Sequence, residues 1–160
     1  KKKYRGLVNK RRTTLELGEA YDFTETGVKP ELQDYMNGQV LNELEYCLNL
    51  YDLEPKVYIA YDRLAYFEKG NDDLRISFDT NIRTRRSDLL LESGDHGKRL
   101  LDSDVWLMEI KTSLAKPLWL CEMLSEFEIR SSSFSKYGTE YKKYIAENEE
   151  ENYVEVRKYA

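Results

Sequence analysis

The chain is poor in the residues that many enzymes use for acid–base and nucleophilic chemistry. Its 160 residues include one histidine, His96, and two cysteines, Cys47 and Cys121. A single histidine in a turn-like S-G-D-H-G segment argues against Ser-His-Asp and Cys-His catalysis and against a zinc site. The cysteines lie far apart and outside any C-x-x-C pattern, so we expect reduced thiols in a cytoplasmic protein rather than a disulfide framework.

The chain also lacks long hydrophobic runs and an excess of positive charge. No apolar run approaches the roughly 20 residues that cross a bilayer, and no apolar segment follows the opening K-K-K-Y-R to make a signal peptide. The net charge of −5 makes most of the surface repel nucleic acid, so we expect no nucleic-acid partner. Because the chain starts without Met and inside an expected strand, we expect it to be N-terminally incomplete. A membrane-protein partner in the parent system stays open.

What the chain does contain is a strand pattern with one charged face, between Leu74 and Arg86. Apolar side chains occupy most even positions up to Ile82, whereas the odd positions are polar and include Arg75 and Arg83. Successive side chains of a strand point to opposite faces, so the segment predicts one apolar face and one arginine-bearing face. A half-buried strand with its polar side in water gives the same alternation. The function therefore depends on what the other segments add.

The other segments predict a mixed architecture of strands and helices. Gly70-Asn71-Asp72 is typical of a turn, which joins 56–67 and 74–86 into an antiparallel hairpin. We treat residues 1–145 as one domain and 146–160 as a solvated acidic tail. The remaining predicted elements are two short strands within 1–17, a helical region at 30–53 with a break near Asn37-Gly38, a strand at 105–111, and helices at 117–127 and 137–144.

Charged residues on several strands suit a polyanion that is held together with a metal. Arg75 shares a strand face with Ser77 and Asp79, and Glu109 shares one with Lys111. Arginine and lysine bind phosphate oxygens, whereas a carboxylate among them suits a hard metal ion. A closed sheet can carry such an interior, because inward and outward residues alternate along every strand.

Several of these residues also have a purely structural interpretation. Asp79 either pairs with a neighbouring arginine or touches a metal ion, and Lys111 is either a structural partner of Glu109 or a phosphate contact. Three arginines either run out into solvent at a strand end or join the charged face: Arg83, Arg85 and Arg86.

Four segments together resemble the polyphosphate polymerase domain of the vacuolar transporter chaperone (VTC) family, a triphosphate tunnel metalloenzyme (CYTH-like) domain. They are K-V-Y-I-A-Y-D-R-L-A-Y, L-R-I-S-F-D-T-N-I-R, L-M-E-I-K and S-F-S-K-Y-G-T. The resemblance implies an α+β fold in which an antiparallel β-barrel forms a tunnel with helices packed outside. It implies that the γ-phosphoryl group of ATP is transferred onto a growing inorganic polyphosphate chain, with Mn²⁺ (or Mg²⁺) as cofactor. The family's first tunnel strands are expected to be missing here.

The resemblance also implies a set of site residues. Arg63 of Y-D-R, Arg75 of L-R-I-S-F-D and Lys136 of F-S-K-Y are the implied catalytic phosphate clamps, and Glu109 of M-E-I-K is the implied metal ligand. The further implied phosphate contacts are Lys1 at a strand end, Lys10 and Arg12 on the basic strand that follows, and Lys111 beside the metal ligand.

Two alternatives to the polymerase remain at this point. One is a tripolyphosphate or nucleoside triphosphate hydrolase of the same fold, in which water replaces the polyphosphate acceptor. The other is a module that binds polyphosphate without turnover, which the expected loss of the first strands favours. ATP and inorganic polyphosphate are the expected partners of the site, and the oligomeric state is open.

Overall fold

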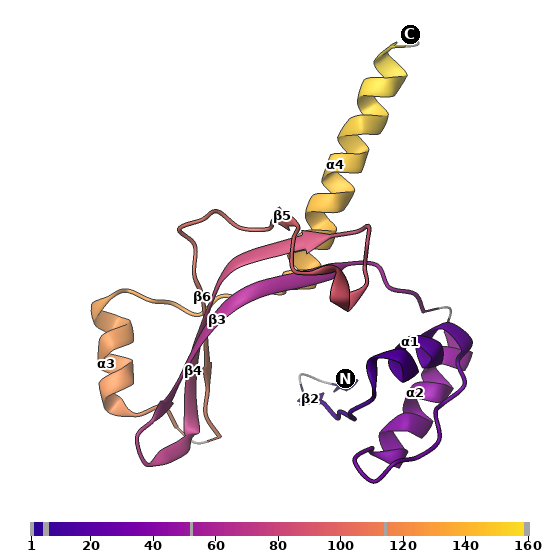
Figure 1. The fold of residues 1–160 in the computed structure, drawn as a ribbon. Helices are drawn as coiled ribbons and strands as arrows, with labels where there is room; N and C mark the ends of the chain where they lie inside the picture. Colours follow the sequence, from indigo (N-terminus) through magenta and orange to yellow (C-terminus); the bar gives the residue numbers. More distant parts are fainter. Residues whose placement is uncertain (1, 5–6, 52, 114, 159–160) are drawn as a thin grey trace. The chain divides into compact units, whose positions relative to one another are not determined.

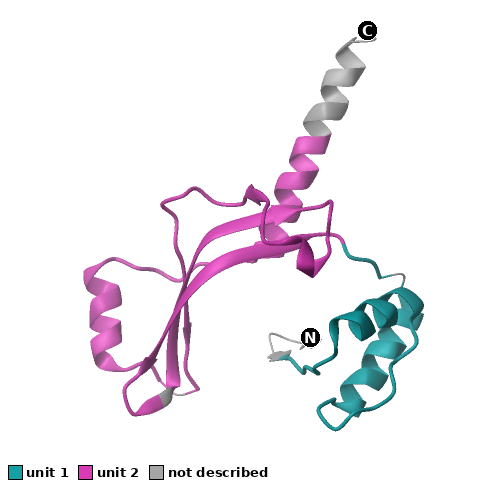
Figure 2. Cartoon of the chain, in the orientation of Figure 1, with its two compact units in different colours: residues 1–55 teal, residues 56–160 magenta. Residues whose placement is uncertain are grey.

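The chain folds into two compact units, residues 1–55 and residues 56–160 (Figures 1 and 2). The division predicted from the sequence, with a boundary after residue 145, stays a prediction. The structure is a computed structural model that describes residues 2–4, 7–51, 53–113 and 115–158.

The first unit combines a small strand pair with two helices. Strands β1 (Lys2–Tyr4) and β2 (Leu7–Asn9) pair antiparallel, which confirms the two short strands expected in this region. The chain leaves strand geometry after Asn9, so the prediction of a basic strand carrying Lys10 and Arg12 is wrong. Both side chains are exposed on an irregular segment that leads to the first helix.

Helices α1 (Leu17–Thr26) and α2 (Gly38–Leu50) supply the core of this unit. Helix α2 begins at Gly38 rather than at Pro30, because the Asn37 side chain accepts a hydrogen bond from the Val40 N–H and caps the helix. The predicted break near Asn37-Gly38 is therefore the start of the helix. The buried core of the first unit is formed by Phe23 of α1, Leu41 of α2 and Met36 of the segment between them. Leu15 and Leu48 pack against this core.

The second unit is built on one long hairpin. Strands β3 (Tyr58–Glu68) and β4 (Asn71–Arg85) pair antiparallel across a turn at Gly70, where φ is 78°, as the sequence predicts. Two short strands pair with the other edge of β4 at different points. Strand β5 (Lys98–Arg99) pairs with the last residues of β4, and β6 (Leu107–Lys111) pairs with the first half of β4.

The sheet is antiparallel and open over the described residues. Strands β3, β5 and β6 each pair with β4 and with no other described strand. Helices and an antiparallel sheet together fit the predicted α+β class, but the sheet is not closed into the predicted barrel. Closure would need hydrogen-bonded neighbours for the outer edges of β3 and β6, and the described chain supplies none there.

A bulge divides β4 into two halves with different side-chain parity. Asp62 lies opposite Thr80 and Ala60 lies opposite Arg83, so β4 carries one extra residue between these pairs. Asn81 accommodates it with a φ of 48°, in the left-handed region that asparagine tolerates better than most residues. The even and odd positions of β4 therefore exchange faces at this point.

Two helices complete the second unit. Helix α3 (Leu118–Glu126) follows Pro117 and ends before Phe127, as predicted. Helix α4 (Lys136–Lys158) starts one residue before the predicted helix and continues through the segment expected to be a solvated tail. The first half of α4 is tied to the sheet by side-chain contacts, which the charge composition alone does not reveal. A 3₁₀ turn, η1 (Leu91–Ser93), lies in the loop after β4. None of the described helices is long and apolar enough to cross a membrane.

Candidate functional site: a cationic face on the sheet

The register of the second unit gathers charged side chains on one face of the sheet. Directly opposite residues of antiparallel strands share a face. Arg63 of β3 lies opposite Asp79 of β4, and Arg75 of β4 lies opposite Lys111 of β6. Glu109 of β6 faces the buried Ser77. We call this surface, together with Lys136 at the start of α4, the cationic face.

Asp79 is the centre of the cationic face. Arg63 donates to it in bidentate fashion, with Nε 2.5 Å from Oδ1 and Nη2 2.7 Å from Oδ2. Lys136 Nζ donates to the same Oδ2 over 2.6 Å. The Asp79 side chain is only 2% exposed, whereas Arg63 and Lys136 keep 30% and 20% of their side-chain surface. A buried carboxylate therefore holds two cations that still reach solvent.

The protonation equilibria follow this arrangement. Burial alone raises the pKa of Asp79, but the hydrogen bonds from Arg63 and Lys136 outweigh it, so the pKa lies below its ordinary value of 3.8. The hydrogen bond to Asp79 in turn raises the pKa of Arg63. Asp79 is thus ionised near neutral pH, and the open question over its role is answered in favour of pairing with cations.

The two cations retain hydrogen-bond donors for a ligand. A guanidinium carries five N–H donors and an ammonium carries three. Asp79 uses two of the donors of Arg63 and one of those of Lys136. The remaining donors sit on two groups that a single carboxylate oxygen holds close together, which is an arrangement suited to a phosphate.

Tyr61 supports both cations from the same face. Its ring centroid lies 4.9 Å from the Arg63 guanidinium carbon and 4.4 Å from Lys136 Nζ. Cations within about 6 Å of an aromatic face are attracted by its quadrupole. Tyr61 shares the strand parity of Arg63, and this parity is the signal in the sequence that could have identified it.

Glu109 and Lys111 form the exposed edge of the cationic face. Lys111 Nζ lies 3.3 Å from one Glu109 oxygen, and Arg63 Nη2 lies 3.9 Å from the other. About half of each side chain of the Glu109–Lys111 pair is exposed, so this pair is weak. Lys111 is a structural partner of Glu109 here, and its role as a phosphate contact stays a prediction.

The carboxylates limit how a divalent cation could be held. Within the described part of the chain, no three His, Cys, Asp or Glu side chains gather around one point. Asp79 is occupied by Arg63 and Lys136. A Mg²⁺-type ion at a phosphate site commonly takes one or two carboxylates and completes its shell with substrate oxygens and water. The exposed Glu109 fits a metal that arrives with a phosphate ligand, and the residues do not form a self-sufficient metal cage.

Arg75 is the least constrained cation of the face. It is partly buried on β4, and among the described residues it makes no ion pair and no side-chain hydrogen bond. No described side chain therefore competes with an anion for its guanidinium. The four cations of the face, Arg63, Arg75, Lys111 and Lys136, oppose the two carboxylates Asp79 and Glu109, so the face has a formal excess of two positive charges.

A shallow cavity of about 240 Å³ lies beside this face. Glu109 and Lys136 line it from β6 and α4, and Ser132 and Phe134 line it from the segment before α4. The cavity brings the implied metal ligand and one implied phosphate clamp to a common space. Strand parity could not predict that Glu109 and Lys136 lie close together, because Lys136 is on a helix.

The arginines beyond the Asn81 bulge have structural partners instead. Arg85, of which 8% is exposed, donates to the carbonyl oxygens of Asp88, Leu90, Gly94 and His96. Its guanidinium carbon also lies 3.7 Å from the Tyr58 ring centroid. Arg83 pairs with Asp62 and Asp95, and Arg86 pairs with Glu140. The interpretation of these three as a solvated strand end is wrong.

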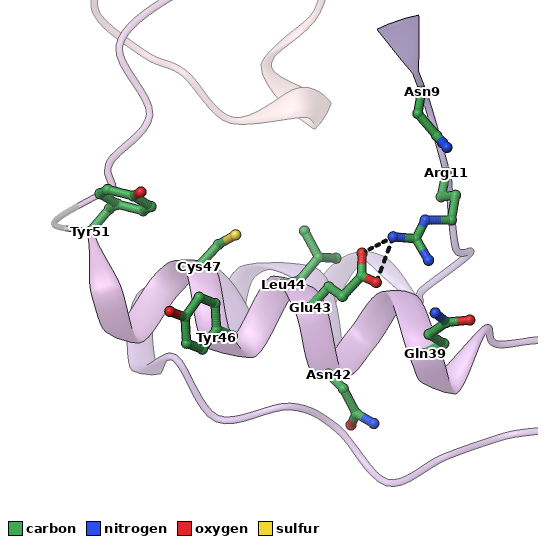
Figure 3. Close-up of a pocket in the computed structure, with 9 residues that line it drawn as sticks. All are labelled: Asn9, Arg11, Gln39, Asn42, Glu43, Leu44, Tyr46, Cys47 and Tyr51. Atoms are coloured by element: carbon green, nitrogen blue, oxygen red, sulfur yellow. Dashed lines mark hydrogen bonds and ion pairs between the residues drawn. The ribbon is translucent and has the colours of Figure 1, made fainter. Parts of the chain in front are cut away.

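The remaining predicted residues do not belong to the described part of the second unit. Lys1 lies outside the described residues, and Lys10 and Arg12 belong to the first unit. That unit has a cavity of its own, of about 480 Å³, between α2 and the segment after β2 (Figure 3). There the neighbouring Arg11 points at the carboxylate of Glu43 and pairs with it. None of the described residues that were predicted for the phosphate site lines this cavity.

The fold and the site define an α+β domain that presents a cationic face on an antiparallel sheet. Residues 1–145 match the model of the VTC domain, and the chain therefore belongs to the VTC domain family. This family is associated with polyphosphate polymerase activity, which directs the function of the chain toward polyphosphate. No curated protein and no solved structure matches the chain.

Proposed function

We propose that this chain binds the phosphates of ATP and of inorganic polyphosphate on the cationic face and transfers the γ-phosphoryl group of ATP to the polyphosphate end. One observation carries the proposal: Asp79 holds Arg63 and Lys136 on one carboxylate with donors left over for a phosphate. Membership of the VTC domain family supports the choice of polyphosphate as the ligand.

The reaction asks for little covalent chemistry from the protein. An oxygen of the terminal phosphate of the polyphosphate attacks the γ-phosphorus of ATP, a new P–O–P bond forms, and the bond to ADP breaks. The attacking oxygen already carries negative charge near neutral pH, so no general base is needed. This agrees with a chain that has a single histidine. Positioning and charge stabilisation dominate such phosphoryl transfers.

The residues of the cationic face would share this work. Arg63 and Lys136 would hold non-bridging oxygens of the transferred group, and Arg75 would bind a neighbouring phosphate. Glu109 would hold a Mn²⁺ or Mg²⁺ ion, which when bound neutralises charge that develops on the phosphate oxygens. Tyr61 would keep the two central cations on the same side of the sheet.

The family's closed tunnel and a cytoplasmic location belong to the proposal as well. A tunnel would require further strands along the open edges of β3 and β6. A cytoplasmic location is supported by the need for ATP and by the free thiols of Cys47 and Cys121.

The test is to incubate the chain with ATP and Mn²⁺ and to follow ADP, orthophosphate and polymer together. Polymerisation predicts polyphosphate and ADP with little orthophosphate. Orthophosphate without polymer would replace the polymerase with the hydrolase, and salt-sensitive binding of polyphosphate without turnover would replace it with the binding module. The absence of both turnover and binding would contradict the proposal.

A matched pair of lysine variants ties the result to the site. Lys136→Ala removes a cation of the cationic face, whereas Lys142→Ala removes an exposed lysine of the same helix. Activity and polyphosphate binding should fall for Lys136→Ala alone. Equal losses in both variants would indicate a general effect of charge rather than this site.

A further inference from the structure

Helix α4 meets the sheet along one stripe of its surface. Lys136, Glu140, Lys143 and Glu147 recur every three or four residues, which places them on one side of a helix. Their partners lie along the sheet and the loop that follows it. Lys136 binds Asp79, Glu140 binds Arg86, Lys143 donates to the Leu100 carbonyl, and Glu147 binds Lys98.

The Arg86–Glu140 pair differs from the other contacts of this stripe. Both bonds of the bidentate pair measure 2.8 Å, from Nε and Nη2 of Arg86 to the two oxygens of Glu140. The Glu140 side chain is 8% exposed, and the guanidinium carbon of Arg86 lies 3.6 Å from the Tyr144 ring centroid. The Lys98–Glu147 pair, in contrast, is mostly exposed. Pairs that are shielded and bidentate fix geometry far better than exposed ones.

Lys136 is the first residue of α4, and its side chain is long and flexible. The Ser135 side chain accepts a hydrogen bond from the Gly138 N–H and caps this end of the helix, but the cap ties the helix only to its own chain and not to the sheet. Glu140 is one turn further along the same side of the helix. A shift of α4 by one turn would move Lys136 by about 5.4 Å, which exceeds hydrogen-bonding distance from Asp79.

We infer that Arg86 and Glu140 are positioning residues that fix the register of α4 and thereby hold Lys136 against Asp79 on the cationic face. Tyr144 reinforces them by covering the guanidinium. Neither Arg86 nor Glu140 touches the proposed ligand. Their consequence for phosphate binding rests on the proposed function, whereas their effect on the position of Lys136 does not.

The first measurement reports the position of Lys136 without any ligand. Limiting acetic anhydride is applied to the full chain, and acetylation of each lysine is quantified by mass spectrometry. In Glu140→Gln, labelling of Lys136 should rise about fivefold, because the ion pair with Asp79 no longer shields its amine. In the control Glu147→Gln, labelling of Lys98 should rise while that of Lys136 stays at the wild-type level. Unchanged labelling of Lys136 in folded Glu140→Gln would overturn the inference.

The second measurement is a double-mutant cycle on tripolyphosphate affinity. Lys136→Ala and Glu140→Gln should each weaken binding, and the double variant should bind no more weakly than Lys136→Ala. Additive losses would overturn the inference. If labelling of Lys136 increased but tripolyphosphate affinity did not change in any variant, the inference about positioning would hold. The proposed function would then be contradicted.

A second variant keeps the test decisive if Glu140→Gln does not fold. Arg86→Lys retains the charge but loses the bidentate bond and most of the overlap with Tyr144. Its labelling of Lys136 should rise by a smaller factor, about twofold. Wild-type labelling in this variant would count against the inference just as it would in Glu140→Gln.

Discussion

The two halves of β4 carry similar arginines and use them in opposite ways. Before the bulge at Asn81, Arg75 has no side-chain partner among the described residues, and Asp79 holds cations that keep free donors. After the bulge, Arg85 donates to four backbone carbonyls. Arg83 donates to the carboxylates of two aspartates and to two backbone carbonyls. One half therefore offers positive charge to a ligand, and the other uses it to hold a loop.

The partners of a cation thus decide its role more than its place in a sequence pattern does. A guanidinium has five donors, and a ligand can use only those that the fold leaves free. Arg85 closes the loop at 88–96 and retains little surface, so it cannot bind a phosphate. Arg75 and Arg85 occupy odd positions of one strand, yet only Arg75 remains available.

The largest expected effect concerns Arg85. Arg85→Met should lower the free energy of unfolding by about 4 kcal/mol, because four carbonyl groups lose a charged donor within a mostly buried site. Tripolyphosphate affinity of the folded fraction should not change. Urea denaturation and isothermal titration calorimetry measure the two quantities. A loss of affinity with little loss of stability would instead indicate that Arg85 binds the ligand rather than holding the loop.

Replacing Asp79 should lower stability but strengthen the binding of tripolyphosphate. Asp79→Asn deprives Arg63 and Lys136 of their buried carboxylate and should cost about 3 kcal/mol of unfolding free energy, since breaking a buried pair is expensive. Metal-free tripolyphosphate binding should strengthen, because a negative charge near the ligand contributes roughly 1 kcal/mol of repulsion. The asparagine carbonyl still accepts one hydrogen bond, so the cations keep part of their order. Weaker binding in a folded Asp79→Asn would show that orientation outweighs charge.

The pH dependence of stability should differ between variants in the two halves of β4, represented by Asp79 and Arg85. The pKa of Asp79 is lowered in the folded state, so its charge contributes stability above the unfolded pKa of about 4 and loses that contribution as the pH falls through the folded value. The stability difference between wild type and Asp79→Asn should be constant from about pH 7 to 5 and shrink below about pH 4. The difference for Arg85→Met should persist, because neither a guanidinium nor a carbonyl titrates there. A constant gap for Asp79→Asn would contradict its pairing with the cations.

Strand alternation and turn chemistry are enough to predict the hairpin of the second unit, its strand β6 and its helix α3, but not β5. The hairpin around Gly70, the strand ending at Lys111 and the helix after Pro117 all appear where the local signals place them. Helix α1 lacks a strong signal, since its cap depends on two glutamates, Glu16 and Glu19. The length of α4 was missed because a glutamate-rich helix and a solvated acidic segment have similar compositions.

The site was predictable within strands and much less so between elements. Parity placed Arg75 with Asp79 and Glu109 with Lys111, and the registers confirm both pairs of neighbours. The bulge at Asn81 could not be predicted, because parity assumes an unbroken strand. It moves the later arginines out of register with the cationic face. The contact of Lys136 with Asp79 spans 57 positions in the sequence, and only the fold reveals it.

Arg75 provides a smaller test of the first half of β4. Arg75→Ala should weaken tripolyphosphate binding by about 2 kcal/mol with or without metal, which is typical of a charged hydrogen bond. Stability should change by less than about 0.5 kcal/mol, since no described ion pair or side-chain hydrogen bond is lost. Arg130→Ala, at an exposed arginine of the second unit, is the control and should change neither quantity. Unchanged affinity in Arg75→Ala would remove this residue from the site.

Glu109 should give the smallest and most specific effect. Glu109→Gln removes the one ionised oxygen ligand that the exposed edge of the cationic face offers to a metal. The gain in tripolyphosphate affinity on adding Mn²⁺ should therefore shrink by about 1 kcal/mol. Metal-free affinity should stay the same or rise slightly, because the carboxylate repels a polyanion when no cation lies between them. Glu122→Gln, at an exposed carboxylate of α3, controls for the loss of a negative charge and should leave the Mn²⁺ dependence unchanged. If folded Glu109→Gln instead lost metal-free binding, the role of Glu109 would be to orient the cations for the ligand rather than to hold the metal.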